Sequence, residues 1–128
     1  MKELLILLFS ILILPVSVNA ADVYYCSDTE KIGFDPKDNY SNGNYIPDKF
    51  KILIDFENKN VISSDIFLDE RSDIKCVLNP YMVLYCINDY GTAFSISKNN
   101  LVFRKSIVWY SEGQTDDISI SYGTCDKF

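Results

Sequence analysis

Histidine is absent from this chain, and its absence removes several classes of chemistry at once. Histidine is the commonest general base, the commonest metal ligand and the proton carrier of most nucleophilic triads. None of the cysteines forms a C-x-x-C pair of the kind that structural zinc sites use. The sequence therefore predicts no metal site and no cofactor, and we expect the protein not to be an enzyme.

Basic residues are also scarce. The chain has 12 Lys and Arg against 18 Asp and Glu, which gives a net charge of −6 at pH 7. An acidic surface repels phosphate backbones, so we do not expect nucleic acid as a partner. It also offers no cluster of positive charge for anionic lipid headgroups.

Only the N-terminus carries a long apolar run. Lys2 precedes predominantly apolar residues at 4–14, and small residues follow up to Ala20. This order is typical of a secretory signal peptide, and the run is shorter than the about 20 residues that cross a membrane. We expect residues 1–20 to be a signal peptide and residues 21–128 to form one periplasmic or secreted domain, not inserted in a membrane after signal removal. The alternative is an uncleaved N-terminal anchor.

The four cysteines all follow the proposed signal peptide, and an even number in an exported chain favours disulfides. Cys76 and Cys86 flank an Asn-Pro turn signal at residues 79–80. Their even spacing places both side chains on the same face of a hairpin. This pairing leaves Cys26 to bridge with Cys125, which would tie the first strand to the last.

Nearly all of the domain alternates between apolar and polar residues with a period of two, as strands do. Turn signals recur at intervals of roughly ten residues, which is typical of an antiparallel meander in a sandwich or small barrel. We therefore predict an all-β domain. We favour the barrel, because a bridge between the end strands goes with closure, and closure removes exposed edges. The predicted strands are residues 50–56, 61–68, 74–78, 82–87, 94–96, 101–109 and 118–122.

Three segments depart from simple alternation. Lys105 interrupts an otherwise apolar face and suggests a bulge or bend there. Residues 82–87 are apolar on both faces, which predicts a central or covered strand. Residues 35–47 are rich in Asp, Asn, Gly and Pro, so we expect a long surface loop.

Several short patterns contain residue types that carry chemistry, but they lack the context that the chemistry needs. The S-x-x-K pattern at residues 95–98 runs along a strand instead of opening a helix, and its companion motifs are missing. Adjacent acidic residues and one acidic loop do not have the spacing of a carboxylate pair or a calcium loop. These acidic groups are Asp69 and Glu70, Asp116 and Asp117, and Asp35 and Asp38 with Asn39.

Tyrosine is frequent, with 9 residues. Tyrosine forms strands well, so most of these side chains should pack on the sheet. It is also enriched in contact surfaces, because it offers a stiff apolar area with a polar tip. We predict a binding patch first among Tyr81, Tyr90 and Tyr110 at strand ends, and Tyr40 and Tyr45 in the loop.

Four stretches carry a resemblance to known proteins: YYC at residues 24–26, IGFDP at 32–36, LYCINDYG at 84–91 and GTCDKF at 123–128. On these the chain resembles a group of uncharacterised short exported proteins of marine bacteria. The resemblance spans nearly the whole domain and implies no activity. The layout is also similar to that of the small barrels of exported lysozyme inhibitors, as an analogy of architecture.

The size, the disulfides, the aromatic content and the missing catalytic groups favour a non-catalytic binding or inhibitory module. It would act on an unknown protein partner in the periplasm or outside the cell. The alternative is a carrier of a small hydrophobic ligand in a hollow β-barrel. A weaker alternative is a hydrolase that uses Asp116 or Asp117.

Overall fold

The strands follow the alternation of apolar and polar side chains. The computed structural model describes residues 21–66, 73–109 and 117–128. The only helix among these residues is the short 3-10 turn η1, Pro36–Asp38. No helix in the described part of the chain is long and apolar enough to span a membrane. The strands are β1 (Asp22–Asp35), β2 (Ser41–Asn44), β3 (Lys49–Asp55), β4 (Asn60–Ser64), β5 (Lys75–Leu78), β6 (Val83–Ile87), β7 (Ala93–Ser97), β8 (Val102–Trp109) and β9 (Asp117–Lys127).

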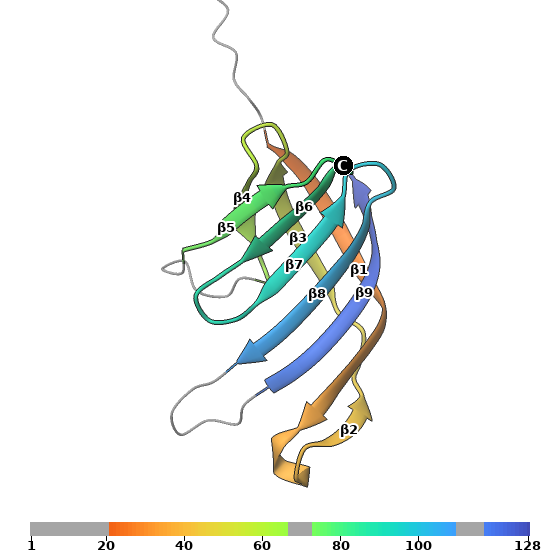
Figure 1. The fold of residues 1–128 in the computed structure, drawn as a ribbon. Coiled ribbons are helices and arrows are strands. Elements are labelled where there is room, and N and C mark those ends of the chain that lie inside the picture. Colours follow the sequence, from red (N-terminus) through yellow and green to blue (C-terminus); the bar gives the residue numbers. More distant parts are fainter. Residues whose placement is uncertain (1–20, 67–72, 110–116) are drawn as a thin grey trace, which may run out of the picture.

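The strands form one antiparallel sheet that is nearly closed into a barrel (Figure 1). Its order is β4-β3-β1-β9-β8-β7-β6-β5, with β2 paired to the far half of β1. The first and last long strands, β1 and β9, lie side by side from Tyr24 opposite Lys127 to Phe34 opposite Ile118. The path ends at β4 and β5, which do not pair with each other. The prediction of an all-β meander that closes into a barrel is confirmed.

Both predicted disulfides are present. Cys26 and Cys125 bridge β1 and β9 over a sequence separation of 99. Cys76 and Cys86 bridge the neighbouring strands β5 and β6 over a separation of 10. Two such bridges are typical of proteins that fold in an oxidising environment.

Aromatic rings fill the barrel interior next to the disulfides. Phe50 lies 5.2 Å from Phe103 and 6.2 Å from Phe94, and the Phe94 and Phe103 rings stack 5.8 Å apart, all measured between ring centroids. Aliphatic side chains from β3, β6 and β7 complete this core. The fully buried aliphatic side chains are Ile52, Ile54, Leu84 and Ile96.

The structure contradicts the bulge predicted at Lys105. Strand β8 keeps an unbroken register with both neighbours through this residue. Lys105 points into the barrel like Phe103, and it pairs there with the buried carboxylate of Asp28 and the half-exposed carboxylate of Asp48. The register shifts instead lie in β1, between Asp28 and Glu30, and in the pairing of β3 with β4.

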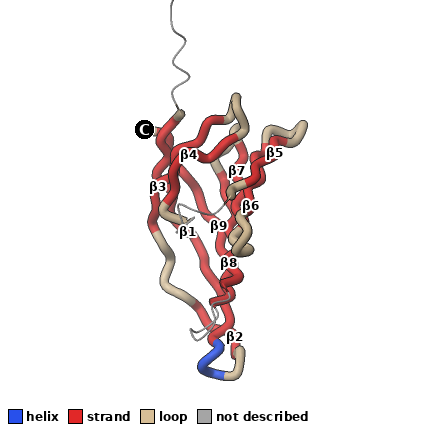
Figure 2. The backbone as a smooth tube through the Cα atoms, turned by 90° about the vertical axis from the view of Figure 1, so that its left-hand side faces the viewer, coloured by secondary structure: helices blue, strands red, loops and turns tan. Residues whose placement is uncertain are grey.

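The segment at 35–47 is more ordered than predicted. Strand β1 runs as far as Asp35, whose carboxylate accepts a hydrogen bond from the Lys37 amide at 2.8 Å and starts the 3-10 turn. Strand β2 then pairs back on β1, at the end of the molecule opposite the C-terminus (Figure 2). The segment was predicted as a loop because β2, at residues 41–44, has the sequence SNGN and no apolar alternation.

Strand β6 is central, as predicted, but it is not covered. It lies between β5 and β7. Its inward side chains Leu84 and Cys86 are buried, whereas the outward Tyr85 and Ile87 are about half-exposed, at 50% and 52%. The candidate functional site lies on this uncovered apolar face.

Candidate functional site

Cross-strand rows of side chains cover the outer face of the sheet from β5 to β9. Side chains that point outward from paired strands lie next to each other. One row runs from Val77 to Tyr85, Ser95, Arg104 and Tyr122, each residue directly opposite the next.

A second row lies two residues further along each strand. It runs from Ile87 on β6 through Ala93 and Ser106 to Ile120 on β9, and continues to Ile32 on β1. Large apolar side chains therefore stand at both ends of the row, and small ones lie between them.

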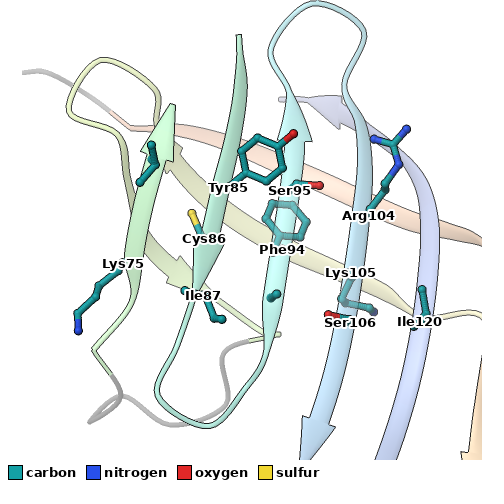
Figure 3. Close-up of a pocket in the computed structure, with 12 residues that line it drawn as sticks. Lys75, Tyr85, Cys86, Ile87, Phe94, Ser95, Arg104, Lys105, Ser106 and Ile120 are labelled. Carbon is teal, nitrogen blue, oxygen red and sulfur yellow. The ribbon is translucent and has the colours of Figure 1, made fainter. Parts of the chain in front are cut away.

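The two rows form a groove of about 380 Å³, which we call the outer groove. Tyr85 and Ile87 form one wall and Ile120 forms the other, as Figure 3 shows. The floor is made of the small residues Ala93, Ser95 and Ser106 of β7 and β8. All of these positions lie inside strands, so their backbone is fixed by the ladder.

A second groove of about 360 Å³ lies on the other side of β9. It shares Arg104 and Ile120 with the outer groove and is lined further by Ile32 and Tyr122. The two grooves make one apolar band from β5 to β1. Exposed apolar patches that cross several strands in this way mark interaction sites.

Positive charge lines the outer groove. Lys75 and Arg104 are among its lining residues, and no carboxylate is. Within the described ranges, no residue pairs with the Arg104 guanidinium. The acid on the far side of β9, Glu30, accepts a hydrogen bond from the Tyr122 hydroxyl at 3.3 Å.

The barrel interior holds a second polar arrangement, which we call the ion cluster: Lys31, Lys105, Asp28 and Asp48. The Lys105 Nζ lies 3.4 Å from a carboxylate oxygen of Asp28 and of Asp48, and 4.7 Å from the Phe50 ring centroid. The side chains of Lys105 and Asp28 are 2% and 0% exposed. Lys31 pairs with Asp48 at 2.9 Å. The cluster joins β1, β8 and the segment before β3.

Two opposing effects act on the pKa of Asp48. Burial raises the pKa, but the hydrogen bonds and positive charges of Lys31 and Lys105 lower it by more than burial raises it. The pKa of Asp48 therefore lies below its usual value. Asp48 is therefore ionised in the folded state at neutral pH, with Lys31 and Lys105 beside it. One oxygen of Asp28, Oδ1, is buried and has no hydrogen-bond partner among the described residues. Because Lys105 and Asp28 are buried and the cations and carboxylates of the cluster pair with one another, we assign it a structural role.

The four predicted tyrosines that the structure describes lie in three different parts of the chain. Tyr81 is 81% exposed in the turn between β5 and β6, and Tyr90 lies in the turn between β6 and β7. Tyr40 and Tyr45 flank β2, where the Tyr45 ring contacts Lys31. None of these four lines the outer groove. Tyr110 lies outside the described residues.

The predictions overlooked Tyr85, Ile120 and Tyr122, which lie in the middle of strands, and Ile87, the last residue of β6. The sequence did contain a usable signal, because a disulfide cysteine fixes which alternate positions of its strand face inward. Since the disulfide holds Cys125 inward, positions 119, 121 and 123 also face inward, and Ile120 and Tyr122 must face outward.

The other patterns form no site among the residues that the structure describes. Ser95 lies on the floor of the outer groove, whereas Lys98 is in the turn after β7. Asp38 accepts a hydrogen bond from the Ser41 hydroxyl at 2.6 Å. The described residues contain no group of three potential metal ligands. The acidic residues at 69, 70 and 116 lie outside the described ranges.

The outer groove offers groups that can contact a ligand or a partner. Its walls offer apolar area, its floor offers serine hydroxyls, and its cations offer hydrogen-bond donors to an anion. Comparison of the chain with protein-family models, with curated proteins and with solved structures finds no match.

Proposed function

We propose that this protein is a non-catalytic binding module that holds a protein partner against the outer groove. The observation that carries the proposal is the apolar band across the middle of the sheet, where an outer face is ordinarily polar. Tyr85, Ile87 and Ile120 are each about half-exposed there, at 50%, 52% and 55%. Covering apolar area yields roughly 25 cal/mol per Å², so a partner gains affinity on this surface.

The groove is pre-organised, which lowers the entropy cost of binding. Its walls and floor stand on paired strands. The Cys76–Cys86 disulfide additionally fixes β5 to β6, the strand that carries Tyr85 and Ile87. A rigid surface of this kind suits an inhibitory or adaptor module.

Export supports the same proposal. The apolar N-terminal run at residues 4–14 and the two disulfides both fit a domain that works in the periplasm or outside the cell. Small domains in such compartments depend on disulfides because their cores are slight.

The packing gives less support to a hydrophobic-ligand carrier. A carrier needs open space inside the barrel, whereas the rings of Phe50, Phe94 and Phe103 contact one another there. A third groove lies over β1 and β3, where Tyr25 and Lys51 line it. All three grooves include half-exposed or exposed residues of the outer face. We therefore place the binding surface outside the barrel.

Replacing Ile87 by Asp is expected to abolish partner capture. The substitution removes an apolar wall and places a charge where the partner would exclude water, and such central positions cost about 2 kcal/mol or more, roughly a thirty-fold loss of affinity. The measurement is an affinity capture from envelope extract with the oxidised domain of residues 21–128 as bait. The matched control is Ile62→Asp, because Ile62 is also half-exposed, at 56%, but lies on β4 and lines none of the described grooves.

The proposal predicts that Ile62→Asp captures the same protein as the unmodified domain and that Ile87→Asp does not. Thermal unfolding of both variants checks that each is folded. Equal capture by folded Ile87→Asp and Ile62→Asp would show that the partner binds elsewhere.

A further inference from the structure

Arg104 lies in the middle of the apolar band and forms no ion pair with a described residue, although Glu30 lines the second groove with it. It points outward from β8, opposite Ser95 on one side and Tyr122 on the other, and lines both grooves. No carboxylate within the part of the chain that the structure describes pairs with it. The guanidinium has a fixed planar set of donors that matches a carboxylate in two parallel hydrogen bonds.

The local charge is opposite to that of the protein as a whole. The net charge is −6, yet the charged side chains that line the outer groove are Lys75, Arg104 and Lys105, and Lys105 is turned into the barrel. Overall repulsion disfavours acidic partners that have no specific fit. A carboxylate that reaches Arg104 gains a charge-assisted contact, so the arrangement favours specificity.

The two rows of the groove also fix the distance between the side chains that a bound segment can place in it. The floor residues Ala93 and Ser106 lie in the Ile87 row, and Ser95 and Arg104 lie in the Tyr85 row, two residues along each strand. Side chains at i and i+2 of an extended segment lie about 7 Å apart on the same side, which is the same period. If an extended segment lies along the groove, side chain i lies over the floor at Ala93 and Ser106, and side chain i+2, on the same face of the segment, lies at Arg104.

We propose that the partner presents an extended segment in which an apolar residue and a carboxylate are two positions apart, with the apolar side chain in the outer groove and the carboxylate on Arg104. This inference rests on the proposed function of the groove as a protein-binding surface. The carboxylate belongs either to an Asp or Glu side chain or to the C-terminus of the partner.

Peptide display tests the proposal without knowledge of the partner. Two random peptide libraries are selected on the oxidised domain, one with peptides closed at both ends by the display protein and one with a free C-terminus. The same selections are run on Arg104→Glu and on Ile87→Asp. The closed library reports side-chain carboxylates, and the free-ended library reports both sources.

The expected result is enrichment of Asp or Glu two positions from an apolar residue, or of an apolar residue near a free C-terminus. On Arg104→Glu, the acidic position is expected to become Lys or Arg, and on Ile87→Asp the enrichment is expected to disappear. For a selected peptide, Asp→Asn or amidation of the terminus should weaken binding to the unmodified domain about tenfold, but not to Arg104→Gln.

The selected peptides could be apolar without an acidic position, and their enrichment could disappear on Ile87→Asp. This result would overturn the role of Arg104, whereas the groove would remain the binding surface. The same holds if Arg104→Glu selects the same peptides as the unmodified domain. Selection of peptides that bind Ile87→Asp equally well, or no enrichment from either library, would overturn both proposals.

Discussion

Replacing Cys26 and Cys125 together by Ala is expected to lower the free energy of unfolding by about 4–5 kcal/mol, because this bridge closes a loop of nearly the whole domain. The sequence separation is 99 for this pair and 10 for Cys76–Cys86. Constraint of the unfolded chain grows with loop length, so the shorter bridge is expected to contribute only about 3 kcal/mol. Urea unfolding of the two double variants, followed by fluorescence of the single Trp, measures the difference.

The Cys76→Ala, Cys86→Ala variant is the matched control, since both bridges join neighbouring strands. Both remove two sulfur atoms from the same barrel; Cys76 is partly buried, and the other three cysteines are buried. Equal losses in the two variants, or a larger loss for the shorter bridge, would contradict the view that Cys26–Cys125, which joins the paired strands β1 and β9, is the main covalent constraint on the unfolded chain.

Lys105→Met is expected to cost about 3–5 kcal/mol, because it leaves a buried carboxylate without its cation. Asp28 is fully buried and has Lys105 as its ion-pair partner. Burying an unpaired charge is expensive, whereas removing both charges together is much less so. Lys105→Met combined with Asp28→Asn is therefore expected to recover a large part of the loss. Chemical denaturation of the single and double variants measures both values.

A surface pair provides the control for this experiment. Lys127 and Asp22 lie 2.8 Å apart, and their side chains are 52% and 43% exposed. Exposed pairs contribute about 1 kcal/mol or less, so Lys127→Met should have a small effect. A loss at Lys105→Met no larger than that at Lys127→Met would show that the ion cluster does not hold β8 to β1.

The strands from residue 50 onward, the barrel and the shorter disulfide followed from local patterns in the sequence, and the longer disulfide followed by elimination. Alternation gave the strands, and the turn at residues 79–80 with the even spacing of Cys76 and Cys86 gave the shorter bridge. The structure bears out the turn, since the Asn79 side chain accepts hydrogen bonds from the amides of Tyr81 and Val83 at 3.0 and 2.9 Å. Interactions of this kind span a few residues, which is why they are predictable.

Lys105 was misread because its partner is distant in the sequence. Asp28 lies 77 residues away, and no residue near Lys105 in the sequence indicates that a buried carboxylate pairs with it. An isolated charge on an apolar face therefore suggested an irregular strand. The register shows instead a regular strand with a neutralised interior charge.

The outer groove was missed because apolar alternation was taken to mark the core face. In β9 the relation is reversed: Ser119 and Ser121 are buried, and Ile120 and Tyr122 are exposed. The inward Cys125 fixes this orientation along the strand. In β1, however, the shift between Asp28 and Glu30 changes the parity after Cys26, and that shift depends on long-range pairing with β9.

Gly123 illustrates that long-range dependence. It lies opposite Asp28, and a Cβ there would collide with the Ser27 carbonyl oxygen and lie 2.9 Å from the Asp28 Cα. The close approach of β1 to β9 thus requires a glycine at this point. The sequence places Gly123 near the end of the chain but does not reveal which strand approaches it.

Photo-cross-linking from position 85 tests most directly whether the outer groove is the partner-binding surface. Benzoylphenylalanine replaces the aromatic Tyr85 in the groove wall or, as a control, Ile62 on β4, and the exported protein is irradiated in the producing cells. We predict a discrete cross-linked adduct from position 85 and none from position 62. Adducts from position 62 with none from position 85 would contradict the assignment of the partner to the outer groove.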